Sequence, residues 1–225
     1  MLDRLAELFP PALIDLFVTS FWETLVMVGI SGVVAALIGI PLGVLLRLTD
    51  RGGVLESLAF NRIAGLLVNA VRSTPFIILL VAIIPFTRMI TGSSIGTAAA
   101  VVPLTIAAAP FIARLVETSL REVDAGLIEA AQAMGATTPQ IVFKVLLPEA
   151  VPGIVAGLTI TLVSLTGYSA MAGAIGGGGL GDLGIRYGYQ RFLPEVMIAV
   201  VLVLIVFVQA VQSLGDWLVR RLSHK

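Results

Sequence analysis

Five long apolar segments constrain the fold of this 225-residue chain more than any other feature. Hydrophobic residues make up 58% of the sequence and charged residues only 12%, and the mean hydropathy is +1.05. A soluble domain carries about 25% charged residues, so a water-soluble fold could not bury this much apolar surface. About 20 mostly apolar residues cross about 30 Å of hydrocarbon. The sequence therefore predicts an all-α, polytopic membrane protein with five spans, at about 21–46, 62–90, 94–112, 151–172 and 195–214.

The spans predict one membrane domain over residues 21–214, with a segment at 1–20 before it and a tail at 215–225 after it. Ala12, Leu13, Leu16 and Phe17 share one helical face behind two prolines, which predicts a short interfacial helix within residues 1–20. We expect no cleaved signal peptide, because the first residues lack a net positive charge and no small-residue cleavage site follows.

The second span is unusual because Arg72 falls inside it. Charges within a span usually face a bundle interior or an aqueous cavity. The alternative is that Arg72 extends along the helix to the membrane edge. The sequence leaves both interpretations open.

Small residues recur at intervals of four along two spans. The first span carries Ser31, Ala35, Gly39 and Gly43, and the fourth carries Gly153 and Gly157. Because lipid offers no hydrophobic drive between helices, close backbone approach at small residues supplies the contacts. The pattern predicts a tight bundle and indicates nothing about transport.

Basic residues in the connections predict the orientation in the membrane. One set of connections holds ten of them and the other holds four, so the first set is expected to face the cytoplasm. The first set is Arg47, Arg51, Arg62, Arg72, Arg114, Arg121, Lys144, Arg220, Arg221 and Lys225; the second is Arg4, Arg88, Arg186 and Arg191. With five spans, the N-terminus is then outside and the C-terminus is cytoplasmic.

The cytoplasmic insert, residues 113–150, has the pattern of two short helices joined by a bend. Asp124 is a suitable cap for a helix over 125–134, Gly135 supplies a left-handed stop, and Thr138 with Pro139 restarts a helix that Leu147 and Pro148 end. Helices of about ten residues are marginal without tertiary packing. The apolar face of the first helix, Leu127, Ile128, Ala131 and Met134, therefore needs a partner, either this chain or another protein.

Several function classes find no support in the sequence. Fourteen basic and fourteen acidic residues leave no net field for nucleic acid, and there is no cysteine and only one histidine, His224. Gly176–Gly181 matches G-x-G-x-x-G only formally, because no strand precedes it, so these glycines favour an extracellular hinge. We therefore expect no catalytic residue, no metal and no bound cofactor in this chain.

The insert resembles the coupling motif of the permease subunits of type I ATP-binding-cassette (ABC) importers. The resemblance lies in Glu129-Ala130-Ala131, Gly135, Pro139 and Leu147-Pro148, with Val145 where the family has isoleucine. Stretches that start at Arg72, Ile84, Val102, Gly167 and Arg186 are similar to the methionine-uptake branch, so the likeness runs from about residue 21 onward.

The resemblance implies the type-1 transmembrane fold and a permease of the bacterial inner membrane that imports an amino acid, methionine in the closest branch. It implies a homodimer, two copies of a cytoplasmic ATPase that bind ATP and Mg²⁺, and an extracytoplasmic substrate-binding (lipo)protein. The residues expected to couple to the ATPase are Glu129, Ala130, Ala131, Met134, Gly135, Pro139, Leu147 and Pro148.

Candidate residues for the transport pathway lie at the outer end of the fourth span. Tyr168, Ser169 and Met171 meet the glycine-rich break there, and Arg72 is a further candidate. A flexible thioether suits a gate. The alternative for the hydroxyl groups of this span is a bond to a backbone carbonyl one turn earlier.

Two other functions remain open. A permease of the same family for another small solute has the same motif. A passive channel or membrane scaffold explains the small-residue packing but leaves the apolar face around Ile128 and Met134 without a purpose. An intramembrane enzyme needs a catalytic dyad that the sequence lacks.

Overall fold

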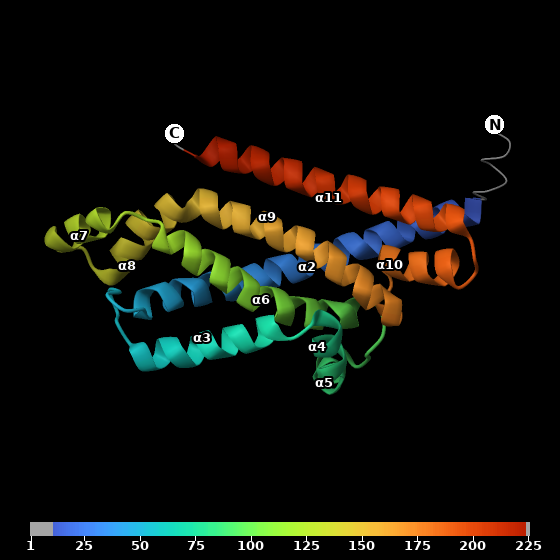
Figure 1. Cartoon of the computed structure of the whole chain (residues 1–225), viewed down its shortest axis with the longest axis horizontal. Coiled ribbons are helices and arrows are strands. Elements are labelled where there is room, and N and C mark those ends of the chain that lie inside the picture. The colour runs from blue at the N-terminus through green and yellow to red at the C-terminus, as the bar shows by residue number, and fades with distance from the viewer. Residues whose placement is uncertain (1–10, 224–225) are drawn as a thin grey trace. The chain divides into compact units, whose positions relative to one another are not determined.

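The computed structural model describes residues 11–223, and within these residues the chain forms helices and no strand (Figure 1). In chain order they are α2 (Pro11–Thr49), α3 (Leu58–Ser73), α4 (Phe76–Ala82), α5 (Ile84–Thr91), α6 (Thr97–Arg121), α7 (Ala125–Ala133), α8 (Thr138–Ile141), a π-helix η1 (Val142–Leu146), α9 (Leu147–Ala172), a π-helix η2 (Gly173–Gly177), α10 (Gly179–Leu183), a π-helix η3 (Gly184–Tyr189) and α11 (Pro194–Leu222).

The helices group into two compact units, and each is described by itself. The described part of unit 1 is residues 11–32, 75–105 and 162–211, and that of unit 2 is residues 33–74, 106–161 and 212–223. The division falls inside α2, α6, α9 and α11, so each of these helices contributes to both units.

The all-α membrane fold with five spans is confirmed, with one span broken. Among the described residues, α2, α6, the helical run Thr138–Gly177 and α11 are each long and apolar enough to cross a membrane. The fifth span is obtained when the bent pair α3 and α4 counts as one.

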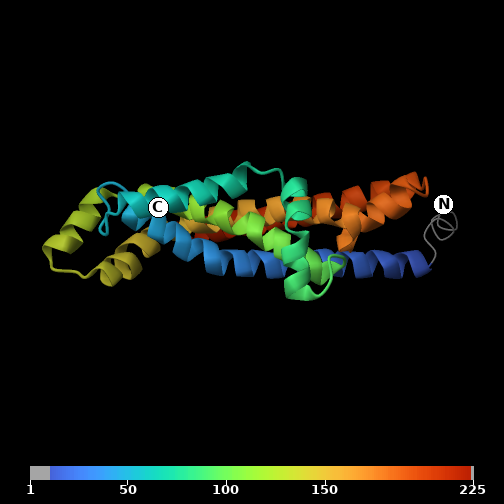
Figure 2. The same ribbon diagram turned by 90° about the horizontal axis from the view of Figure 1, so that it is seen from below.

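The prediction of one continuous helix over 62–90 is wrong. The chain leaves the helix at Thr74, which is extended (φ −84°, ψ 125°), and restarts after Pro75. Proline lacks an N–H and disfavours the helical conformation in the residue before it. Figure 2 shows α4 and α5, both in unit 1, running across the direction of the start of α6.

The start of the chain also differs from the expectation. Residues 11–20 form no separate interfacial helix, because α2 continues without a break from Pro11 to Thr49. The rest of the predicted 1–20 segment and His224 lie outside the described residues.

In unit 2, α2 packs on α6 through the small residues that the sequence singled out. A Cβ at Gly39 would lie 2.6 Å from the carbonyl oxygen of Ala109 and 2.8 Å from Cβ of Ile112. A Cβ at Gly153 would lie 2.7 Å from Oγ of Ser119, so α9 approaches α6 as closely. The prediction of close helix contacts at these glycines is confirmed.

A buried carboxylate adds an electrostatic contact to unit 2. Glu117 on α6 is only 1% exposed, and its oxygens lie 2.6 Å from the guanidinium groups of both Arg114 and Arg121. Arg121 also pairs with Asp50 at 2.8 Å, and Arg114 donates to Asn69 on α3 at 2.9 Å. A charge removed from water needs such paired, hydrogen-bonded surroundings, and here they join α6 to α3 and to the end of α2.

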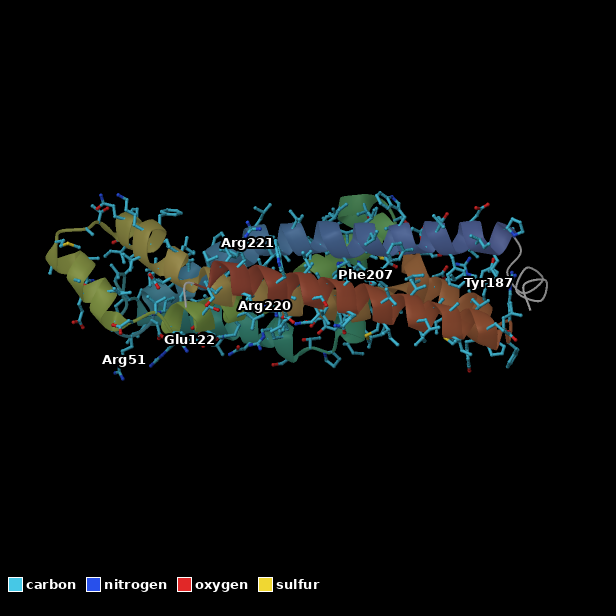
Figure 3. All side chains as sticks on the ribbon, turned by 90° about the horizontal axis from the view of Figure 1, so that it is seen from above. Arg51, Glu122, Tyr187, Phe207, Arg220 and Arg221 are labelled. Carbon is cyan, nitrogen blue, oxygen red and sulfur yellow. The ribbon has the colours of Figure 1, made fainter. Side chains whose placement is uncertain are left out.

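In unit 1, α10 inserts between α2 and α11. Leu180 and Leu183 are buried with Val196 and Val200 of α11, and Phe17 packs against this cluster from α2. The ring of Phe21 meets that of Phe207, labelled in Figure 3, edge to face at 5.8 Å between centroids.

Replacing Gly39 by alanine tests the packing of α2 on α6. The added methyl group has no room, so we expect Gly39→Ala to lower the free energy of unfolding by about 1–3 kcal/mol. The measurement is thermal unfolding of the detergent-solubilised chain. Gly29→Ala is the control, because nothing lies within 4 Å of a Cβ there and alanine is the better helix former. A melting temperature for Gly39→Ala equal to that of Gly29→Ala would contradict the packing.

Candidate functional site

The insert folds as a capped helix followed by a left-handed turn. Oδ1 of Asp124 accepts a hydrogen bond from the N–H of Gly126 at 2.7 Å, so the predicted cap is confirmed. After α7, Gly135 has a φ of +77°, and its N–H donates to the carbonyl of Gln132 at 2.9 Å. Only glycine adopts this conformation without strain, so the predicted stop at Gly135 is confirmed.

The second helix of the insert differs from the expectation in two ways. Thr137, not Thr138, is its N-cap residue, and the N–H of Thr137 donates to Oε1 of Gln140 at 2.8 Å. The helix also does not end at Leu147 and Pro148. It continues through η1 into α9, where the N–H of Leu147 donates to the carbonyl of Val142 across a wider π-helical turn. Pro148 cannot donate a backbone hydrogen bond, and the π-helical geometry lies directly before it.

The predicted apolar face of α7 is divided by the fold. Ala131 is buried and Ile128 is half-buried within unit 2, whereas Leu127 and Met134 are exposed, Met134 at 82%. Glu129, Ala130 and Gly135 are exposed beside them. Four of the proposed coupling residues, Glu129, Ala130, Met134 and Gly135, thus form an exposed strip. Pro139 and Pro148 are also exposed, whereas Leu147 is half-buried and Ala131 is buried.

Phe143 is a surface residue that the sequence analysis missed. Ile141, Val142 and Leu146 are buried in unit 2, while the side chain of Phe143 is 70% exposed. The signal was present in the periodicity, since Phe143 falls away from the positions of these three inward residues. A large exposed aromatic side chain in the second half of the insert enlarges the surface available to a partner.

Two hollows of unit 2 border the insert. One, of about 180 Å³, is lined by residues that include Arg47 and Glu129, so opposite charges face the same space. The other, of about 600 Å³, carries the acidic residues Glu122, Asp124 and Glu149 beside Leu127 and Pro148; Glu122 is labelled in Figure 3. The second hollow presents negative charge and apolar surface together.

The gate candidates do not share one environment. In unit 1, Tyr168 stacks on Phe76 of α4 with 4.7 Å between centroids, and Met171 is 40% exposed. Ser169 is buried, and its hydroxyl donates to the carbonyl of Thr166 at 2.8 Å. Three threonine hydroxyls of α9 also bond the carbonyl one turn earlier, so the alternative for these hydroxyls is confirmed; they are Thr159, Thr161 and Thr166.

Arg72 belongs to unit 2 and not to the unit that holds Tyr168 and Met171. Its guanidinium lies 5.8 Å from the ring centroid of Phe111, in cation–π range, and its side chain is exposed. Across residues 11–223 there is no cluster of three or more metal-binding side chains.

Comparison with known proteins agrees with this geometry. The family model of the binding-protein-dependent transport system inner membrane component matches residues 39–224. The "Probable D-methionine transport system permease protein MetI" of Vibrio cholerae is 58% identical over 211 residues, 94% of each chain. The "D-methionine transport system permease protein MetI" of Escherichia coli K12 is 58% identical over 158 residues, 70% of this chain and 73% of that one.

A solved structure supports the same assignment. A crystal form of the inward-facing "MetNI methionine ABC transporter" superposes with a TM-score of 0.94 at 52% identity, over 95% of this chain and 99% of the other. A family match over most of the chain, close full-length relatives and the shared type-1 fold agree. The chain therefore belongs to the family of binding-protein-dependent transport system inner membrane components, the permease subunits of ABC importers.

Proposed function

We propose that this chain is the membrane-spanning permease subunit of an ATP-driven importer of an amino acid, methionine. The observation that supports methionine as the substrate is the 58% identity, over 94% of both chains, to a protein named as a D-methionine permease. The coupling motif supports a separate ATPase as the driving subunit, because its exposed side chains offer a docking surface.

The proposed partners follow from two features of this chain: the missing phosphate-binding loop and the exposed strip of the insert. The sequence has no phosphate-binding loop, so ATP and Mg²⁺ bind to a separate ATPase, and the permease itself catalyses no reaction. Two permease chains, two ATPase chains and an extracytoplasmic binding protein form the complex. The structurally similar MetNI transporter, named as a methionine ABC transporter, supports this assembly.

The ATPase docks on the exposed strip of the insert. Glu129, Ala130, Met134 and Gly135 form the centre of the contact, and Phe143 extends it. Pro148 lies at the acidic hollow with Glu122 and Glu149, which suits a cationic surface on the ATPase. Pro139 and Leu147 shape the second helix of the insert and position this surface.

Movement of the docked insert reaches the membrane along one helical run. Residues Thr138–Gly177 continue from the second helix of the insert through α9, so a displacement that reaches α8 across the turn at Gly135 is carried along the span. Tyr168 and Met171 lie near the far end of α9, where they form the outer gate, with Ser169 in a supporting position. Arg72 is assigned to the transport pathway because its charged side chain is exposed within a predicted span.

The basic connections orient the chain with its N-terminus outside and its C-terminus in the cytoplasm. Arg220 and Arg221, in the last turn of α11, belong to the cytoplasmic set (Figure 3). The membrane domain then covers 21–214, the coupling insert covers 113–150, and residues 215–225 form the cytoplasmic tail.

The decisive experiment is reconstitution of the permease with its ATPase and binding protein in lipid vesicles. We expect ATP-dependent uptake of labelled methionine and co-purification of the ATPase. Uptake of another amino acid in its place would show that methionine is the wrong substrate. Methionine flux without ATP, through a permease oligomer without the ATPase, would favour a passive channel.

A substitution at the left-handed turn tests the docking surface. Valine at φ +77° is strained by about 1–2 kcal/mol or more, so we expect Gly135→Val to distort the turn and reduce both ATPase attachment and uptake at least about tenfold. Membrane insertion should be unchanged, as measured by the amount of chain in the membrane fraction. Glu129→Lys should act in the same direction.

The matched control is Gly92→Val, because Gly92 also has a positive φ (+74°) with nothing near its Cβ, but belongs to unit 1 and not to the insert. If Gly135→Val and Glu129→Lys both retain normal uptake, or if Gly92→Val releases the ATPase as strongly, the docking assignment is wrong.

Truncation of Met171 tests the gate. We expect Met171→Ala to raise the number of ATP molecules hydrolysed per methionine imported, because the shorter side chain leaves the gate incompletely closed. Met89→Ala is the control, since Met89 is an exposed methionine of unit 1 outside the candidate gate. An unchanged ratio and uptake rate in Met171→Ala would remove this residue from the gate.

A further inference from the structure

Two neighbouring side chains of α2, Glu23 and Thr24, cap the start of α10. The N–H of Gly179 donates to Oε2 of Glu23 at 2.6 Å, and the N–H of Leu180 donates to Oγ1 of Thr24 at 2.9 Å. The first N–H groups of a helix have no partner within it. A side chain at the N-cap position usually accepts from them, but here that position is Gly178, so the acceptors come from another helix.

The backbone at the start of α10 is shaped for this contact. Gly179 has a φ of +77°, and a Cβ on it would lie 2.7 Å from Oγ1 of Thr24 and 2.6 Å from Cε of Met27. A side chain at this position would be strained and would push α2 away. The glycine-rich segment, which the sequence analysis interpreted only as a hinge, therefore brings backbone donors within reach of α2.

The opposite side of α10 rests on the end of α9. A Cβ on Gly181 would overlap the carbonyl oxygen of Ala170, and one on Gly173 would lie 2.5 Å from the backbone nitrogen of Asp182. Ala170 and Gly173 flank Met171 in the sequence. A five-residue helix in unit 1 thus contacts α2 on one side and the segment of Met171 on the other.

We propose that Glu23 and Thr24 are positioning residues for the outer gate: they hold α10 on α2 and thereby fix the end of α9 that carries Met171. The inference rests on the proposed function in that Met171 is taken as a gate residue. Glu23 supplies the shorter contact, 2.6 Å against 2.9 Å for Thr24. Gly179 and Leu180 are both buried, so either backbone N–H that loses its acceptor is left as an unpaired buried donor.

A single introduced thiol reports on this contact. The chain contains no cysteine, so Ile175→Cys, at a 43% exposed position of η2 whose backbone is not helical, gives one reactive site in the glycine segment. The measurement is the rate of labelling by a membrane-impermeant maleimide, in the full complex in vesicles. We expect Glu23→Ala and Thr24→Val each to raise this rate about tenfold, the change that corresponds to losing one such hydrogen bond.

Three further variants separate positioning from folding. Asp15→Ala removes an exposed carboxylate of the same helix, and Thr24→Ser keeps the hydroxyl acceptor, so both should label at the unmodified rate. Glu23→Gln keeps a carbonyl oxygen as acceptor and should give an intermediate rate. If Glu23→Ala does not assemble, the comparison of Glu23→Gln with Asp15→Ala and of Thr24→Val with Thr24→Ser decides the outcome.

The results distinguish this inference from the proposed function. Equal labelling rates in all assembled variants, or an equal increase in Asp15→Ala, would overturn the positioning role even if methionine uptake is normal. Faster labelling in Glu23→Ala and Thr24→Val would support it even if the complex imports another solute. When uptake is measured as well, we expect Glu23→Ala to consume more ATP per imported molecule, and Asp15→Ala to behave as the unmodified complex.

Discussion

Direct contact between helix backbones is the interaction on which both units depend. In unit 2, Gly39 lets α2 lie against the carbonyl groups of α6, and in unit 1, Gly181 lets α10 lie against those of α9. Apolar side chains gain little by leaving lipid for one another, so dispersion between closely packed atoms must hold the helices together. The contacts are short and specific, and each therefore fixes how one helix is rotated against its neighbour within its unit.

Features encoded by local chemistry were predictable from the sequence. Four continuous spans, the Asp124 cap and the turn at Gly135 follow from apolar length, a side-chain acceptor and a residue without Cβ. The division of the second span was signalled by Pro75, but its apolar composition alone favoured one long helix. The continuation past Pro148 was not predictable, because a proline that opens a new helix and one that follows a π-helical turn in a continuous run look the same in sequence.

The sequence predicted only part of the candidate site, because burial depends on contacts with distant parts of the chain. Periodicity placed Leu127, Ile128, Ala131 and Met134 on one face, but which of them is covered depends on the rest of unit 2, and only Ala131 is fully buried. Ser169 had an alternative partner in its own helix, which it uses. The contact from Glu23 to Gly179 joins residues 156 positions apart, and no local sequence pattern predicts it.

The π-helical turn Val142–Leu146 stands between the docking helices and the span of α9. A turn of this kind holds one residue more than the α-helical turn it replaces, and such turns are rare and frequently lie at functional sites. The surplus residue changes the rotation of α8 about its axis relative to α9 from that of an uninterrupted α-helix. The side of the insert that is presented to a partner is therefore set in part by this one extra residue.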